Sequence, residues 1–267
     1  AGYTLGADNA GRPLFARFGR TASTTTTTPV KSTYNSMQVK VDRKFRNGFL
    51  MTNSYTLGRG YNYFQGDSNG GISTPADFER SWGRTSFDST HSFTSSFVYL
   101  LPFGPNGKWM NDGLAGRILG DWQVSGIFAA ISGTPIDFTA SAAGLRAPGN
   151  TQRPNASAKP EVIGGIGSSA HWFDTSVFSA PADGTWGNVE RNALLTGPAY
   201  VNLDASIVKI IRFGDRHVEF RVDMLNATNT PHYSNPNGSL GNANFGRVTG
   251  IIGQTERVVR FGGRFLF

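Results

Sequence analysis

The sequence predicts an all-β fold of long antiparallel strands, and three observations carry that prediction. Apolar and polar residues alternate with a period of two in seven separate segments, which is the spacing of a strand with two unlike faces. Glycine (34 residues) and phenylalanine (20 residues) are abundant, whereas charged residues make up only 16% of the chain. Turn signals and loops rich in Gly, Asn, Ser and Pro separate the alternating segments.

Residues 1–32 are expected to form an N-terminal loop or an incomplete strand region. Residues 33–267 are expected to form one domain that contains the strands. The strand candidate in the first region is RPLFARFGR, residues 12–20, whereas the polar low-complexity stretch at 21–30 is typical of a loop.

The first four strands are expected at 33–45, 49–58, 88–101 and 118–131. Each alternates clearly, as in SMQVKVD, LMTNSYTL, SFTSSFVYL and DWQVSGIF. Asn47-Gly48 separates the first two strands, and this dipeptide favours a two-residue hairpin turn.

The last three strands are expected at 200–211, 216–227 and 256–267. They contain YVNLDASIV, VEFRVDML and RVVRFGGRFLF, and a short turn at 212–215 separates the first two. The final strand ends in phenylalanine, although most soluble domains end in a few loose polar residues.

A soluble antiparallel sandwich would also alternate, but three details favour a transmembrane barrel. The strands are about ten residues long, as a membrane-spanning strand requires. The polar faces carry full charges in register. Aromatic residues lie near the strand ends, as in the girdles of outer-membrane barrels: Phe45, Tyr55, Tyr99, Trp122 and Phe267.

The connections between the strands differ in length in a regular pattern. If the C-terminus is periplasmic, the long segments 59–87, 132–199 and 228–255 all fall on the extracellular side, and both tight turns fall on the periplasmic side. The connection at 102–117 must then also be periplasmic, although it is longer. Because single-chain bacterial barrels close with an even number of strands, seven strands must pair with strands outside this sequence, or with an eighth strand from 12–20.

The charged residues of the polar faces form the first candidate site. We expect these side chains to face the lumen, and alternating charge favours structural ion pairing there over a path for solute. The set comprises Lys40, Asp42, Lys44, Asp204, Glu219, Arg221, Asp223, Glu256, Arg260 and Arg264.

Four aromatic residues in the loop 132–199 form the second candidate site. Exposed aromatic rings among Gly, Pro and Asn suit capture of a carbohydrate or peptide, but the alternative that they pack the loop on itself is favoured. The four are Trp172, Phe173, Phe178 and Trp186.

Other classes of function lack their signatures. The net charge of +7 comes from scattered single residues, so a nucleic-acid partner is not expected. Neither a signal peptide nor an apolar run long enough for a transmembrane helix is recognisable. The absence of cysteine excludes a thiolate metal site, and no hydrolase, phosphate-loop, zinc-protease or calcium motif occurs. We therefore expect no enzyme, metal or cofactor, and surface or interface roles for the histidines.

Eight segments in order resemble a known family. They include YNSMQVKVDRKFRNGFLMTNSYTLGRG, THSFTSSFVYLLPFG, SGTPIDFT, HWFDTSVFSAP, GNVERNALLTGPAYVNLDASIVK, VEFRVDMLNATNTPHYSNPN, FGRVTG and RFGGRFLF. Over residues 33–267 the chain looks like the C-terminal part of large TonB-dependent outer-membrane receptors. It is most similar to the Oar-like subgroup, whose members begin with a carboxypeptidase-regulatory-like domain.

The resemblance implies a location in the bacterial outer membrane and a role in uptake of a large nutrient, such as a siderophore, oligosaccharide or peptide. These strands would be the last of a 22-stranded barrel. The implied partners are outer-membrane lipid, the remaining strands and plug from the parent polypeptide or another chain, and TonB through parts outside this sequence. Phe261, Phe265 and Phe267 resemble the signal that the barrel-assembly machinery reads. The alternatives are a structural or surface-assembly barrel component without transport, and a soluble β-rich enzyme or binding module.

Overall fold

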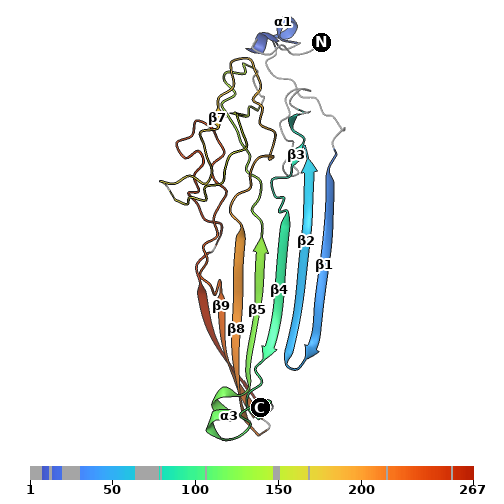
Figure 1. The fold of residues 1–267 in the computed structure, drawn as a ribbon, viewed down its shortest axis with the longest axis vertical. Helices are drawn as coiled ribbons and strands as arrows, with labels where there is room; N and C mark the ends of the chain where they lie inside the picture. The colour runs from blue at the N-terminus through green and yellow to red at the C-terminus, as the bar shows by residue number, and fades with distance from the viewer. Residues whose placement is uncertain are drawn as a thin grey trace.

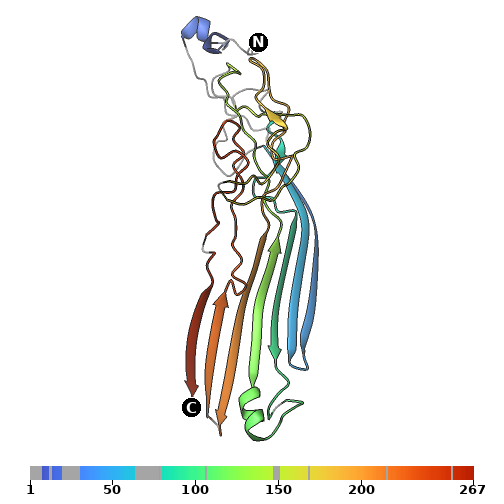
Figure 2. The same ribbon diagram turned by 60° about the vertical axis from the view of Figure 1, so that its left-hand side comes forward.

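The protein forms a tall curved wall of strands, with irregular loops at one end and short connections at the other (Figure 1). The computed structural model describes residues 8–11, 14–19, 31–63, 78, 80–105, 107–146, 151–167, 169–214, 216–253 and 255–267. Figure 2 shows the same strands running side by side along the long axis.

All seven predicted strands are confirmed, and they pair antiparallel in chain order. The order across the sheet is β1 (Thr33–Arg46), β2 (Phe49–Asn62), β4 (His91–Leu100), β5 (Trp122–Ile131), β8 (Tyr200–Phe213), β9 (Arg216–Leu225) and β10 (Val258–Leu266). The short β3 (Gly83–Arg84) pairs with the end of β2, and β6 (Asn155–Ala156) pairs with β7 (Phe178–Ser179) in a separate sheet.

The register divides the sheet into an apolar face and a polar face, because directly paired residues of antiparallel strands lie on the same side. One continuous row on the apolar face consists of Phe49, Tyr99, Val124, Ile207, Val222 and Phe261. A neighbouring row on the polar face consists of Leu50, Val98, Ser125, Ser206, Asp223 and Arg260. The predicted alternation therefore extends across the whole sheet.

The connections alternate between the two ends as predicted. The β1–β2 and β8–β9 turns, the β4–β5 connection and the C-terminus lie at one end, and the long loops lie at the other (Figure 1). Asn47 and Gly48 have φ angles of 55° and 76°, and both residues of a type I′ hairpin turn require positive φ.

Two predictions about elements are wrong. The strand expected at 118–131 begins at Trp122, because the preceding residues form the helix α3 (Gly113–Leu119), in which Leu114 and Ile118 have helical spacing. The candidate eighth strand at 12–20 contains instead a helical turn, α1 (Phe15–Phe18), which ends at Gly19 with a left-handed φ of 61°. The low-complexity stretch at 21–30 lies outside the described residues.

Near the N-terminus the described residues also contain a 3-10 turn, η1 (Asp8–Gly11). No helix in the described part of the chain is long and apolar enough to cross a membrane.

We expect Gly48→Ala to lower the free energy of unfolding by about 1–2 kcal/mol, because a side chain disfavours the left-handed conformation. An added Cβ would also lie 2.8 Å from the carbonyl oxygen of Leu100. The midpoint of urea unfolding in phospholipid vesicles measures this loss. Gly263→Ala is the control, since its Cβ would meet nothing within 4 Å. Equal midpoints for the two variants would contradict the assignment of this turn.

Candidate functional site

The polar face of the sheet is hollowed where β4, β5, β8, β9 and β10 meet. The hollow has a volume of about 480 Å³. Its polar lining comprises Ser96, Ser125, Asp204, Ser206, Arg221, Asp223 and Arg260. The sheet is therefore concave on its polar side, which is the curvature that places a polar face inside a barrel.

Opposite charges are matched on this face. Arg221 Nε donates to Asp223 Oδ1 at 2.6 Å, and Arg260 lies directly beside Asp223 in the register. At the far edge of the sheet, Lys40 Nζ lies 3.0 Å from Asp42 Oδ2. Pairing of this kind satisfies charges on an inner wall and supports the structural interpretation of these residues.

Asp204 organises the exit of the chain from β9. Its Oδ1 accepts hydrogen bonds from Asn202 Nδ2 at 3.0 Å and from the backbone N–H of Asn226 at 2.8 Å. Asn226 has a φ of 48° and is buried, and its Nδ2 donates to the carbonyl oxygens of Thr230 and Thr255. Sequence reasoning missed Asn226, although asparagine is a residue that tolerates left-handed φ at strand ends.

The register brings most of the predicted lumen-facing residues onto one face. Those that share the hollowed side are Lys40, Asp42, Asp204, Glu219, Arg221, Asp223, Arg260 and Arg264. Lys44 lies at a register shift between Arg43 and Arg46, and Glu256 precedes β10, so strand pairing assigns neither one. That this face lines a lumen stays a prediction.

The long loops fold into a compact unit with its own aromatic core. The rings of Phe138, Phe173, Phe178 and Phe245 lie with centroids 4.8–5.7 Å apart. Ile136, Val189 and Leu195 complete the buried cluster. The labels β7 and β3 mark this end in Figure 1.

The four loop aromatic residues therefore divide into two pairs. Phe173 and Phe178 are buried in the core, so their rings pack the loop on itself and are not open to a ligand. Trp172 is half-buried against the core, and its Nε1 donates to the carbonyl oxygen of Thr196. Trp186 is half-buried beneath the guanidinium of Arg80, at 5.1 Å. A ligand contact stays a prediction for these two tryptophans.

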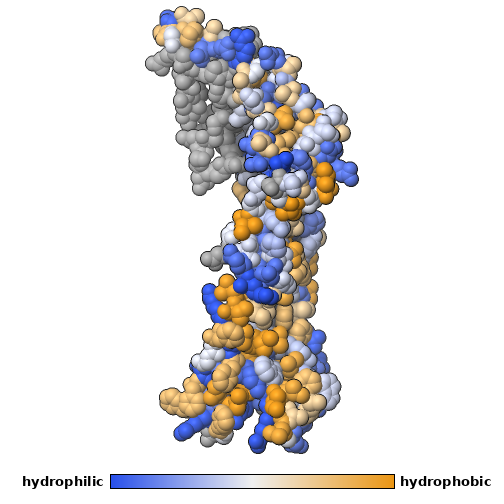
Figure 3. Space-filling view, turned by 90° about the vertical axis from the view of Figure 1, so that its left-hand side faces the viewer, coloured by the Kyte–Doolittle hydropathy of each residue, from blue (hydrophilic) through white to orange (hydrophobic). Residues whose placement is uncertain are grey.

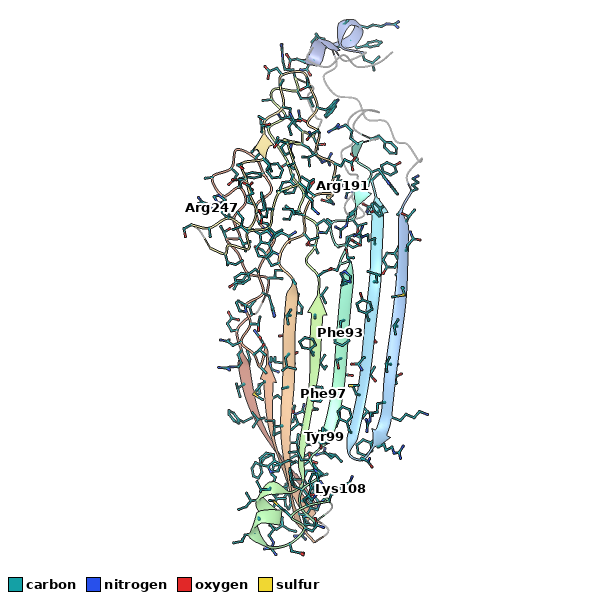
Figure 4. All side chains as sticks on the ribbon, in the orientation of Figure 1. Phe93, Phe97, Tyr99, Lys108, Arg191 and Arg247 are labelled. Atoms are coloured by element: carbon teal, nitrogen blue, oxygen red, sulfur yellow. The ribbon has the colours of Figure 1, made fainter. Side chains whose placement is uncertain are left out.

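Arg191 ties the loop unit to the end of β2. Its side chain is buried, and Nη1 donates to the carbonyl oxygen of Asn62 at 2.7 Å and of Ser81 at 3.2 Å. Burial lowers the pKa of Arg191, an effect that the nearby carboxylate of Asp137 opposes. The neighbouring Asn192 is fully buried, and its Nδ2 donates to the carbonyl oxygen of Arg84. Figure 4 shows Arg191 where the loops meet β3.

A second cavity, of about 770 Å³, lies beside Arg191. Its charged lining comprises Arg59, Arg84, Lys159, Arg191 and the single carboxylate of Glu190. Tyr61 and Trp82 also line it, with ring centroids 6.1 Å apart. Sequence reasoning missed this cavity because β2, β3 and the loop before β8 contribute to it from distant parts of the chain.

Three histidines, His91, His217 and His232, have separate local partners. His91 Nδ1 lies 2.8 Å from Tyr55 Oη, and His217 Nε2 lies 3.5 Å from Glu219 Oε1. His232 is buried, contrary to the expected surface position, and packs its ring on Tyr200. In the described ranges, no three His, Asp or Glu side chains are grouped so as to hold a metal ion.

Comparison with known proteins assigns the chain to a family. The family model described as the outer membrane beta barrel domain matches residues 1–260. No curated protein and no solved structure matches the chain.

We expect Arg191→Met to loosen the loop unit, because it removes a charged donor from the buried carbonyl oxygens of Asn62 and Ser81. The loss should be about 2–4 kcal/mol of local stability, seen as faster protease cleavage within residues 132–199. Arg59→Met is the matched control, because Arg59 lines the same cavity but is exposed. Equal cleavage rates in the two variants would show that Arg191 does not hold the loops.

Proposed function

The chain belongs to the outer membrane beta barrel domain family, and from this premise we propose that it is the C-terminal wall of a TonB-dependent receptor that takes up a large nutrient. The protein is located in the bacterial outer membrane. In this proposal the apolar face of the sheet contacts lipid, and the hollowed polar face lines the lumen. The resemblance to the Oar-like subgroup supports this more specific assignment.

The observation that carries the proposal is the pair of sheet edges. In the described residues, β1 and β10 each pair with one neighbour, and every residue of β1 is exposed. Unpaired backbone N–H and C=O groups cost several kcal/mol each in hydrocarbon, so both edges require further strands. Strands from the parent polypeptide or another chain would supply them, and the closed barrel would be wide enough for a plug.

The loop end supports uptake of a solute with anionic groups. Four basic side chains and one carboxylate line the cavity beside Arg191, and the rings of Tyr61 and Trp82 form part of its wall. Arg84 is paired with Asp88, and Arg191 donates to backbone carbonyl groups, so Arg59 and Lys159 are the cations that would meet a solute. Basic and aromatic side chains together suit a polar solute that carries carboxylates or phosphates. Siderophores, acidic oligosaccharides and acidic peptides share this chemistry.

The C-terminal residues support assembly by the outer-membrane machinery. Phe261 and Phe267 are 82% and 96% exposed, and Phe261 and Phe265 share the apolar face in the register. In our proposal they contact lipid after assembly and are read by the barrel-assembly machinery before it.

The second candidate is a structural or surface-assembly component without transport. The same open edges favour it, because they could pair with other chains rather than with strands of one parent polypeptide. The two candidates differ in the size of the polypeptide that carries this sequence.

We expect the intact polypeptide in outer membranes to have several times the 28.8 kDa of this chain, because a plugged barrel needs many more strands. Detergent extraction followed by intact mass spectrometry measures it. The larger polypeptide should also contain a plug domain before this region.

Either of two results would contradict receptor function. A stable species near 28.8 kDa would favour the structural candidate. A large parent polypeptide without any plug would rule out energised uptake.

A further inference from the structure

The connection between β4 and β5 carries a helix that is fixed to the apolar face of the sheet. α3 immediately precedes β5 and lies at the short-connection end (Figure 1). Trp122 and Lys209 are directly paired in the register, in a position that continues the apolar face beyond Val124 and Ile207. Both side chains contact α3, so the helix lies on the apolar side of the sheet rather than under the hollowed side.

The contacts of Lys209 and Trp122 satisfy the C-terminal carbonyl groups of α3, which a helix leaves without internal partners. Lys209 Nζ donates to the carbonyl oxygens of Arg117 at 2.8 Å and Ile118 at 3.2 Å, and also to that of Gly120. Trp122 Nε1 donates to the carbonyl oxygen of Ile118 at 2.8 Å. Lys209 lies on the apolar face and is only 9% exposed. The helix carbonyl groups compensate its positive charge, and its Nζ lies 5.4 Å from the centroid of the Trp122 ring.

The outward side of this connection is apolar. Leu114 and Ile118 are one helical turn apart and are 76% and 63% exposed. The other large apolar side chains exposed here are Trp109, Met110 and Leu119. Figure 3 shows apolar residues gathered in the lower half of the molecule, the half that contains α3, with hydrophilic residues between them.

Basic side chains accompany this apolar surface. Lys108 precedes α3 in the chain, and Arg117 lies within the helix. Figure 4 labels Lys108 at this end of the molecule. Tryptophan and basic residues beside an apolar helix face are typical of segments that lie at the boundary between acyl chains and headgroups.

We propose that residues 108–119 form an interfacial anchor that places Leu114 and Ile118 among the acyl chains of the periplasmic-leaflet phospholipids. Lys108 and Arg117 then lie at the level of the lipid phosphates. Lipid is the occupant because α3 is attached to the apolar face of the sheet, which contacts lipid in the proposed barrel. The short-connection end is the periplasmic end of outer-membrane barrels. The anchor depends on the outer-membrane location of the chain and not on transport.

The absence of cysteine from this chain allows a direct test. Leu114→Cys and Ile118→Cys, introduced into the assembled polypeptide, are labelled with an environment-sensitive fluorophore. The protein is reconstituted into phosphatidylglycerol–phosphatidylethanolamine vesicles with bromine near the headgroup end of the acyl chains. We expect the bromines to quench about half of the emission or more, because the apolar face of an interfacial helix lies at that depth.

Two control labels define the background. One label is placed by Ala158→Cys, because Ala158 is exposed in the loop unit. The other is placed by Asp112→Cys, because Asp112 is exposed just before α3. We expect the label at Ala158 to be unquenched by brominated lipid and the label at Asp112 to be quenched less than those at Leu114 and Ile118. Aqueous iodide should show the reverse order.

Lys209→Met tests the position of the helix separately. It removes the donor to three carbonyl groups of the α3 segment and leaves an apolar residue on the apolar face. We expect assembly to be retained and lipid quenching at Leu114 to fall at least about twofold, because the helix end is no longer held at the membrane boundary.

Three results would overturn the proposal. The labels at Leu114 and Ile118 could be quenched by iodide as strongly as that at Ala158. They could be shielded only when a periplasmic protein is added, which would identify a protein partner. Their shielding could also increase with the protein-to-lipid ratio, which would identify a second copy of the chain. None of these results would bear on the receptor assignment.

Discussion

Complete pairing of backbone N–H and C=O groups is the constraint on which the rest of this structure depends. Hydrocarbon offers no partner for them, so every strand within it must have a neighbour on each side. Seven long strands that pair with their neighbours in chain order satisfy this requirement between β1 and β10. In the described residues, β1 and β10 each have one strand neighbour, and in the proposed barrel further strands would meet the requirement at these two edges.

The same register separates the environments of the side chains. Because neighbouring residues point to opposite sides, aromatic and branched side chains gather on one face, which contacts lipid in the proposed barrel, while charges pair with each other on the other face. Arg221 with Asp223 and Lys40 with Asp42 show that the polar face is internally neutralised rather than dominated by one sign. The cavity at the loop end has a different balance of charge, with four basic side chains and one carboxylate in its lining.

A different irregular segment is fixed to the sheet at each of its two ends. At the loop end, an aromatic core and the buried Arg191 make a compact unit from segments that show little regular secondary structure. At the other end, Lys209 and Trp122 hold a short helix on the apolar side of the sheet and satisfy its carbonyl groups. Each end thus uses a buried cation on backbone carbonyls to fix an irregular segment to the sheet.

The sequence by itself determined the strands, their two faces and the ends at which the connections lie, because alternation and turn residues such as Asn47-Gly48 act over a few neighbours. It did not determine α3, which depends on Lys209 about ninety residues away. Nor did it distinguish the buried Phe173 from the half-buried Trp186, since burial depends on which distant rings meet in the loop core. The tertiary structure alone decided these matters and the Arg191 cavity, because contacts between segments far apart in the chain leave no periodic pattern in the sequence.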